Sequence, residues 1–232
     1  MTGRVVVVTG GGTGIGAAVA RRFGEAGDRV FAATHADCDV TDEAAVAEYF
    51  AHVGPVDVLV NNAGVAASAP VERTTLDQWE AQLDVNATGA FLCTRAVLPG
   101  MRERDSGRIL TVASTAALTG ARYTAGYTAS KHAALGLMRT VAAEVAGTGV
   151  TANAVCPTFV RTDMTARSAA RIAAATGRDP ADAEEALATA SPLGRLLEPD
   201  EVAFAVTFLA APEAPSINGQ ALVLDGGGIS VS

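Results

Sequence analysis

The sequence predicts an α/β fold in which a doubly wound parallel sheet is covered by helices on both faces. Short, near-continuous apolar runs recur along the chain, as expected for strands that are buried on both sides. Segments with helical spacing of apolar residues separate most of these runs, and a glycine-rich turn directly follows the first one. The chain has 232 residues, of which 49% are hydrophobic, and no linker interrupts it. We therefore expect one domain over residues 1–232.

Taken in order, the first run leads through its turn into the predicted helix Ile15–Ala26, which Gly27 ends. The connection after the second run is unusual, because only four residues separate Thr34, which follows that run, from the acidic segment Asp39–Asp42. A parallel crossover takes about a dozen residues or more. We therefore expect this edge of the sheet to be cut back, with the outermost strand missing or rudimentary. The six predicted strands are Arg4–Thr9, Val30–Ala33, Val56–Val60, Ile109–Ala113, Thr151–Val155 and Ala221–Leu224.

Charge and composition exclude several classes of partner. Seventeen basic and 25 acidic residues give a net charge of −8, and no basic run is present, so we expect no nucleic-acid partner. No apolar stretch reaches membrane-spanning length and no leader precedes the first strand, which favours a cytoplasmic protein with a small-molecule ligand. The spacing of Cys38, Cys93 and Cys156 supports neither a disulfide framework nor a metal site. We expect three reduced, mostly buried thiols.

Two glycine-containing turns follow predicted strands and indicate a phosphate-containing ligand. The first combines backbone freedom with the N-terminus of a helix, whose free N–H groups attract a pyrophosphate. A second turn, Asn61–Gly64, ends another predicted strand; taken alone, it is as readily an ordinary turn. The residues predicted to bind are Gly10, Gly12, Thr13, Gly14, Ile15 and Gly16 in the first turn, and Asn62, Ala63 and Gly64 in the second.

Tyr127 and Lys131 carry the strongest chemical signal. Four residues apart on a helix predicted to begin near Thr124, they share one face. Lys131 is the only lysine, whereas the other 16 basic residues are arginine, so a role as mere surface charge is disfavoured. A neighbouring ammonium favours a phenolate and lowers the pKa of the phenol by about one to three units. We therefore expect Tyr127 to act as an acidified general acid and base.

These motifs resemble, in order and over essentially the whole chain, those of the short-chain dehydrogenase/reductase family, which has a Rossmann-type fold. The resemblance implies an NAD(P)-dependent oxidoreductase acting on a secondary alcohol or ketone, without a metal. It also implies that Tyr127 is the acid and base, that Ser114 binds the substrate oxygen, that Lys131 holds the nicotinamide ribose, and that Asn86 supports a relay water. Alternatives are a catalytically silent or redox-sensing nucleotide-binding module and a carrier-linked β-ketoacyl reductase.

The resemblance extends to further coenzyme contacts. Thr158 departs from the family pattern, which has glycine at this place, so the backbone here is expected to be less free. Asp39 is equally well explained as a helix cap. Carboxylates and the lack of nearby basic residues after the second strand favour NAD(H), with NADP(H) left open. The additional predicted contacts are Thr34, His35, Asp39, Val40, Pro157, Val160 and Thr162.

Residues 164–199 are predicted to form a substrate lid, with a helix over Ala181–Ala190 that starts at Asp179-Pro180. Arg167 and Arg171 share a helical face and are either solvated charges or contacts for an acidic substrate or a carrier phosphopantetheine. The C-terminal third resembles bacterial β-ketoacyl and polyketide ketoreductases and hydroxybutyrate dehydrogenases. The family also implies a homo-oligomer, a tetramer or dimer, formed through the helices around Leu92 and Tyr127.

Overall fold

A computed structural model describes residues 3–229 and contains a six-stranded parallel sheet with strand order β2-β1-β3-β4-β5-β6. β1, β3, β4 and β5 are almost completely buried, because helices cover both of their faces. The six predicted strands are therefore confirmed, with boundaries shifted by at most two residues. The strands are β1 (Val5–Thr9), β2 (Arg29–Ala33), β3 (Val58–Asn61), β4 (Gly107–Val112), β5 (Val150–Pro157) and β6 (Ala221–Leu224).

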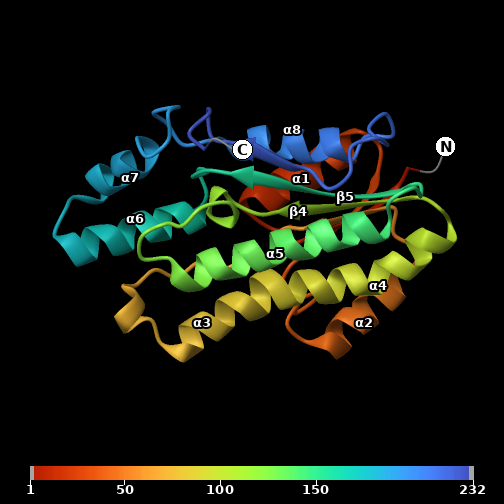
Figure 1. The fold of residues 1–232 in the computed structure, drawn as a ribbon, viewed down its shortest axis with the longest axis horizontal. Helices are drawn as coiled ribbons and strands as arrows, with labels where there is room; N and C mark the ends of the chain where they lie inside the picture. The colour runs from red at the N-terminus through yellow and green to blue at the C-terminus, as the bar shows by residue number, and fades with distance from the viewer. Residues whose placement is uncertain (1–2, 230–232) are drawn as a thin grey trace.

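The sheet is the middle of three layers (Figure 1). One face is covered by α1 (Gly14–Glu25) and α8 (Pro199–Leu209), and the other by α2 (Glu43–Val53), α4 (Gly89–Glu103) and α5 (Ala125–Glu144). Alternate side chains of β1 point to the two faces: Val6 and Val8 pack towards α1 and α8, whereas Val7 packs towards α2, α4 and α5. No helix within residues 3–229 combines the length and apolar character needed to cross a membrane.

β2 forms the edge of the sheet, which confirms the predicted shortening. A tight turn follows it, in which Asp37 accepts hydrogen bonds from the backbone N–H and the hydroxyl of Thr34, at 2.9 and 2.6 Å. The chain then enters α2, whose N-cap is Asp42. The interpretation of Asp39 as a helix cap is wrong, because its carboxylate instead accepts hydrogen bonds from Thr41. No strand lies outside β2 in the described part of the chain.

α6 (Asp163–Thr176) and α7 (Pro180–Ala188) extend beyond the end of the sheet, at the left in Figure 1. As predicted, Asp179 caps α7 and Pro180 is its first residue. The two helices form a small apolar cluster of their own with the segment before α8. The cluster contains Ala169, Ala173, Ala183, Leu187 and Leu196.

The remaining helical segments connect β3 to α4 and β4 to α5. A short 3₁₀ turn, η1 (Val71–Arg73), precedes α3 (Leu76–Leu83), and a π-helical turn, η2 (Asp84–Thr88), joins α3 to α4. A second 3₁₀ turn, η3 (Thr115–Ala117), follows β4. The buried cysteines are all free thiols, as predicted: Cys38, Cys93 and Cys156.

Candidate active site

A cleft of about 740 Å³ opens at the carboxyl ends of the central strands. Its walls come from the turn after β1, the loops after β3 and β4, the start of α5, the segment after β5, and α6. Ligands of open parallel sheets bind at this end, where loops from several strands converge. The structure brings together here Gly10, Thr13, Gly14, Ile15, Gly16, Asn62, Ala63, Gly64, Ser114, Tyr127, Lys131, Pro157, Val160 and Thr162.

The residues predicted to contact the adenosine end of a dinucleotide do not line this cleft. Thr34 and His35 are exposed after β2, and Asp39 is half-buried beside them. Val40 is buried against Gly89 at the start of α4. Gly12 faces Thr34 and likewise lies outside the cleft lining. In the described structure, the cleft therefore includes most of the residues predicted to bind the pyrophosphate and the nicotinamide, but those predicted to bind the adenosine lie outside it.

The turn between β1 and α1 fits a pyrophosphate closely. Gly10 and Gly14 have φ values of +62° and +52°, a conformation that side chains rarely adopt. A Cβ on Gly16 would lie 2.2 Å from the carbonyl oxygen of Gly10. The N-cap residue Thr13 makes no side-chain hydrogen bond to the helix, and the first turn of α1 has no acidic residue. The N–H groups at this end of α1 are thus left available for an anion.

Ser114, Tyr127 and Lys131 meet in the middle of the cleft. Ser114 follows β4, its hydroxyl accepts a 3.1 Å hydrogen bond from the Ala116 N–H, and it lies in the same cleft as the phenol of Tyr127. Lys131 lies one turn further along α5, with its Nζ 5.8 Å from the centroid of the Tyr127 ring. That ammonium donates a 2.9 Å hydrogen bond to the Val112 carbonyl at the end of β4. α5 begins after Thr124, as the sequence predicts.

The expectation of an acidified phenol is wrong for this structure. Burial raises the pKa of Tyr127 above its usual value, and the nearby hydroxyl of Ser114 lowers it by a smaller amount. Burial also lowers the pKa of Lys131 to about 8. The ammonium lies over the ring and is engaged by Val112, so it does not offset the cost of removing a phenolate from water. Tyr127 is therefore protonated at neutral pH and is poised as an acid.

Asn86 lies in the π-helical turn η2, behind the cleft. Its amide exchanges two hydrogen bonds with the backbone of Val65, at 2.8 and 2.9 Å, and donates a third, at 2.9 Å, to the hydroxyl of Ser130 in α5. π-helical turns are rare and often occur at functional sites. Asn86 thus joins the loop after β3 to the helix that carries Tyr127, and both amide protons are already used.

Asn61 is a buried residue at this site that was not predicted as functional. Its Nδ2 donates to Thr94, whereas its Oδ1 has no partner within the described structure. It lines a cavity of about 10 Å³ together with Lys131 and Asn86. A space of this size with polar walls fits one water molecule. The sequence signal was an Asn at the end of a strand whose other residues are apolar.

The segment after β5 is fixed on both sides. Val160 pairs with Leu197, and the Arg161 N–H donates to the Leu197 carbonyl at 2.8 Å. Thr162 then caps α6. Thr158, which replaces an expected glycine, has no left-handed backbone conformation, so the substitution causes no strain. The cleft wall formed by Val160 and Thr162 is therefore well held.

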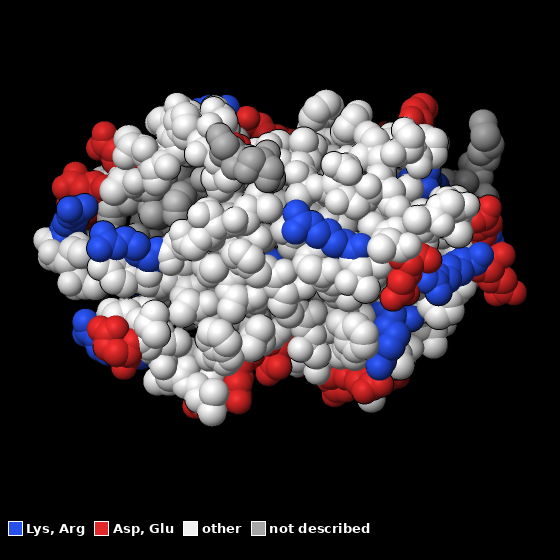
Figure 2. Space-filling model, in the orientation of Figure 1, with Lys and Arg blue, Asp and Glu red and all other residues white. Residues whose placement is uncertain are grey.

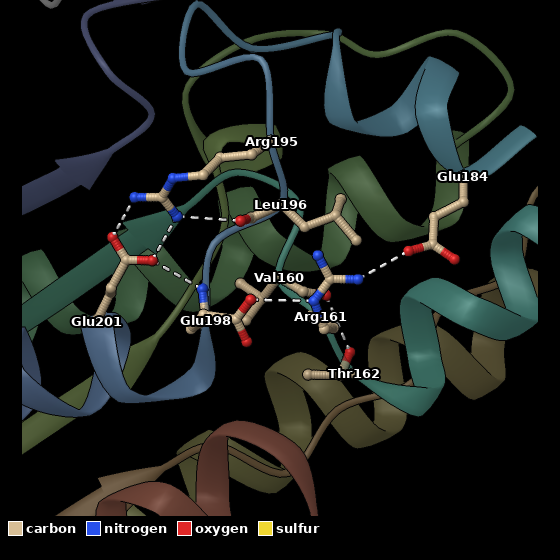
Figure 3. Close-up of polar contacts among 8 residues, drawn as sticks. All are labelled: Val160, Arg161, Thr162, Glu184, Arg195, Leu196, Glu198 and Glu201. Atoms are coloured by element: carbon tan, nitrogen blue, oxygen red, sulfur yellow. Dashed lines mark hydrogen bonds and ion pairs between the residues drawn. The ribbon is translucent and has the colours of Figure 1, made fainter. Parts of the chain in front are cut away.

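Arg161 extends this support to the predicted lid (Figure 3). Its guanidinium bonds to Glu184 of α7 at 2.9 Å and to Glu198 at the start of α8 at 3.0 Å. Glu201 continues the network through the backbone of Glu198 and through Arg195. The Arg195 guanidinium holds the pKa of Glu201 at about 2. The ion pair of Glu201 with Arg195 therefore stays charged throughout the ordinary pH range.

Replacing Arg161 by Leu is expected to loosen α7 and raise the coenzyme KM by about two- to fivefold, with little change in kcat, because exposed ion pairs are individually weak. Trypsin cleavage after Arg178, between α6 and α7, should become faster and should also accelerate with salt in the unmodified protein. Arg95→Leu, which removes an ion pair with Glu43 distant from the cleft, is the matched control. Unaltered cleavage and KM in the Arg161 variant would show that the ion pairs of Arg161 do not hold α7 in place.

Comparison with known proteins finds relatives that match nearly the whole chain. A family model described as enoyl-(acyl carrier protein) reductase matches residues 31–228. The acetoacetyl-CoA reductase of Shinella zoogloeoides is 36% identical over 245 positions, covering 97% of this chain and 98% of that protein. The 3-oxoacyl-(acyl-carrier-protein) reductase of Synechocystis sp. is 36% identical over 255 positions, covering 98% and 97%. A crystal structure of an actinorhodin polyketide ketoreductase variant with NADPH has a TM-score of 0.89 and 35% identity, covering 97% of each chain.

Proposed function

Because the chain belongs to the short-chain dehydrogenase/reductase family, and is an oxidoreductase that moves a hydride between a nicotinamide coenzyme and a secondary alcohol or ketone, we propose that the groups around Tyr127 carry out this reaction. One observation supports the proposal above all. A phenol, a hydroxyl and the ammonium of the chain's only lysine meet in the same cleft as a glycine turn suited to a pyrophosphate. When bound, the coenzyme supplies or accepts the hydride.

In ketone reduction, the protonated phenol of Tyr127 donates its proton to the carbonyl oxygen. The hydroxyl of Ser114 donates a hydrogen bond to the same oxygen, where negative charge develops. In alcohol oxidation the phenolate accepts the proton back. Because burial raises the pKa of Tyr127, the phenol is protonated at neutral pH and can donate the proton that ketone reduction requires.

Lys131 has three ammonium donors, and one is used by Val112. We propose that the others hold the ribose next to the nicotinamide and contact a water in the cavity beside Asn61. With the coenzyme bound, its ribose would lie between Lys131 and Tyr127, and the water would supply the proton that Tyr127 gives up. Because both amide protons of Asn86 are already used, we propose that its part is to hold the loop after β3 and α5 in place around this water.

A panel of substrates tests the proposed function. NADH and NADPH oxidation is measured with simple ketones, β-ketoacyl thioesters and quinones, and Ser114→Ala provides a control in the same cleft. We expect turnover of ketones with at least one coenzyme and a loss of about 100-fold or more in kcat for Ser114→Ala. Coenzyme binding without turnover of any substrate would instead indicate a silent module. Turnover restricted to thioesters would indicate a carrier-linked β-ketoacyl reductase, an alternative suggested by the names of the relatives.

We propose that NAD(H) is preferred over NADP(H) by several-fold. Asp37 and Asp39 follow β2, no Lys or Arg lies between residues 34 and 42, and their carboxylates repel a 2′-phosphate there. Because this surface is open, salt should weaken the preference. The measurement is kcat/KM for both coenzymes at low and high ionic strength, with His35→Arg expected to shift the ratio towards NADP(H). A stronger activity with NADPH in the unmodified protein would refute the preference.

We further propose that residues 164–199 act as the substrate lid of the single domain 1–232, and that the chain forms a homo-oligomer, a tetramer or dimer. Figure 2 shows that the face over α4 and α5 is mostly without charged side chains. Phe204 and Phe208 of α8 are 60% and 49% exposed, and Phe91 of α4 is 43% exposed. Light scattering should give a multiple of the 23.4 kDa chain mass, and Phe208→Asp should reduce it. A monomer at micromolar concentration would contradict the oligomer.

A cytoplasmic location is also proposed. Its support is chemical, since three buried thiols without disulfide partners suit a reducing compartment that contains nicotinamide coenzymes. Fractionation of cells that produce the protein would test the location directly.

A further inference from the structure

Three arginine side chains line the cleft without a carboxylate partner in the described structure. They are Arg122, in the loop before α5, and Arg167 and Arg171, on α6. Within the described residues, six other arginines form ion pairs and seven outside the cleft form none, so these three are distinguished by sharing one cleft; the paired ones are Arg4, Arg21, Arg95, Arg102, Arg161 and Arg195. The protein has eight more acidic than basic residues, so acidic partners are abundant elsewhere. Among the lining residues within 3–229, the one carboxylate is that of Asp163.

The arginines are positioned by neutral groups. Arg171 donates hydrogen bonds to the Ala66 carbonyl at 3.1 Å and to the Ser168 hydroxyl at 3.3 Å. The guanidinium of Arg122 lies 5.9 Å from the ring centroid of Tyr123. Within the described residues, Arg167 makes neither a side-chain hydrogen bond nor a contact with an aromatic ring. None of the three charges is therefore neutralised by its neighbours, and each remains available to an anion.

The wall that carries Arg122 is held in a costly conformation. Tyr123 has a φ of +66°, which is unusual for a residue with a side chain. Its carbonyl accepts a 2.8 Å hydrogen bond from Ala69, and Thr124 pairs with Ala69 in a β-bridge. Strained backbone of this kind persists where the surroundings enforce it, and it is concentrated at binding sites. Arg122 is thus presented to the cleft by a fixed loop.

The place of these charges separates them from the pyrophosphate site. Arg122 precedes Tyr127 by five residues, and Arg171 contacts the loop that follows Gly64. They therefore stand at the reacting end of the cleft, whereas the pyrophosphate is expected at the start of α1. Figure 2 shows both basic and acidic side chains at the end of the molecule where α6 lies, so the anion site is defined by the three arginines that line the cleft. An anion bound there belongs to the substrate.

We propose that the substrate carries an anionic group, a carboxylate or a phosphate, at the end remote from its ketone or alcohol, and that Arg122, Arg167 and Arg171 bind it. Guanidinium groups form charge-assisted, often bidentate hydrogen bonds with both kinds of anion. This inference rests on the proposed reaction at Tyr127, which fixes where the ketone lies. It extends that function by naming the substrate class.

Two pairs of substrates that differ only in charge test the inference. The carboxylate arm compares 4-oxopentanoate with its methyl ester. The phosphate arm compares a β-ketoacyl thioester of phosphopantetheine with the same thioester of pantetheine. In at least one arm, the anionic member should have a kcat/KM about tenfold or more higher at low salt, falling towards the neutral value in concentrated salt. The arm with the larger ratio identifies the anion. Equal rates within both pairs would overturn the inference.

Arg167→Gln should reduce the anionic-to-neutral ratio about fivefold or more, and adding Arg122→Gln should reduce it further. Arg178→Gln is the matched control, because Arg178 is exposed beside α6 but does not line the cleft. An equal effect of Arg178→Gln would show only a general influence of net charge and would also overturn the inference.

Turnover of the neutral ketones decides the proposed function separately. If no ketone reacts, binding of 4-oxopentanoate and of phosphopantetheine to the coenzyme complex is measured by calorimetry in the unmodified protein and in Arg167→Gln. Binding that the variant loses supports the anion site even then, and an absence of binding to the unmodified protein rejects it.

Discussion

Tyr127→Phe is expected to lower kcat for ketone reduction by about 10³-fold or more, while coenzyme affinity changes by less than about threefold. The substitution removes one oxygen atom, and with it the buried phenolic proton donor that lies beside Ser114 and Lys131 in the cleft. The ring that packs beside Lys131 remains. Steady-state rates and coenzyme titration by fluorescence measure the two effects separately.

Tyr49→Phe is the matched control, because Tyr49 is a partly buried tyrosine in α2, outside the cleft. It should retain the rate of the unmodified protein. Because burial raises the pKa of Tyr127, reduction should persist through neutral pH and decline only in alkaline solution. Substantial activity in Tyr127→Phe would remove this phenol from the reaction.

Lys131→Met is expected to lower activity strongly and yet make the coenzyme-free protein more stable. Burial lowers the pKa of Lys131 from 10.5 to about 8, so holding its charge inside the folded protein costs roughly 3 kcal/mol at neutral pH. Loss of the hydrogen bond to the Val112 carbonyl costs about 1 kcal/mol and offsets part of the stability gained by removing the charge. The net gain in the free energy of unfolding at pH 7 is about 1–2 kcal/mol. The kcat should fall by about 100-fold or more.

The pH dependence of this gain has a definite sign. Below pH 8 the lysine is charged in both the folded and the unfolded protein, so the advantage of Met is complete. Between pH 8 and 10.5 the unfolded chain binds more protons than the folded one, and the unmodified protein gains stability as the pH rises. The difference should therefore disappear towards pH 10.5. Urea unfolding at pH 7 and pH 10 measures it, and a less stable variant at pH 7 would show that Lys131 is not held at a cost.

The sheet could be predicted from the sequence because buried parallel strands are apolar on both faces, as in Val5–Val8. The shortened edge could also be predicted, since chain length limits a crossover. The aligned relatives span 245 and 255 positions against 232 residues here, so they contain residues that this chain lacks. The glycine turn and the pair Tyr127 and Lys131 were found because local spacing alone places them.

Features that depend on distant contacts could not be predicted. The π-helical turn at Asn86 is set by bonds to Val65 and Ser130, and neither spacing nor propensity signals it. The raised pKa of Tyr127 results from burial, which a short motif does not reveal. Arg122 is a single arginine in a loop, and only folding brings it to the same cleft as α6. The helix-cap interpretation of Asp39 was wrong because Asp42 caps α2, and the carboxylate of Asp39 instead accepts hydrogen bonds from Thr41.

The cut-back edge beside β2 has a practical consequence. The described structure has no strand outside β2, and Thr34 and His35 are exposed. The purine of a bound coenzyme would therefore lie on a solvent-exposed surface. A linker attached to the purine would then lead directly into solvent, while the nicotinamide stays enclosed. We therefore expect this protein to accept coenzymes tethered to a polymer or bead through the purine, which suits it to reactors that retain and recycle their nucleotide.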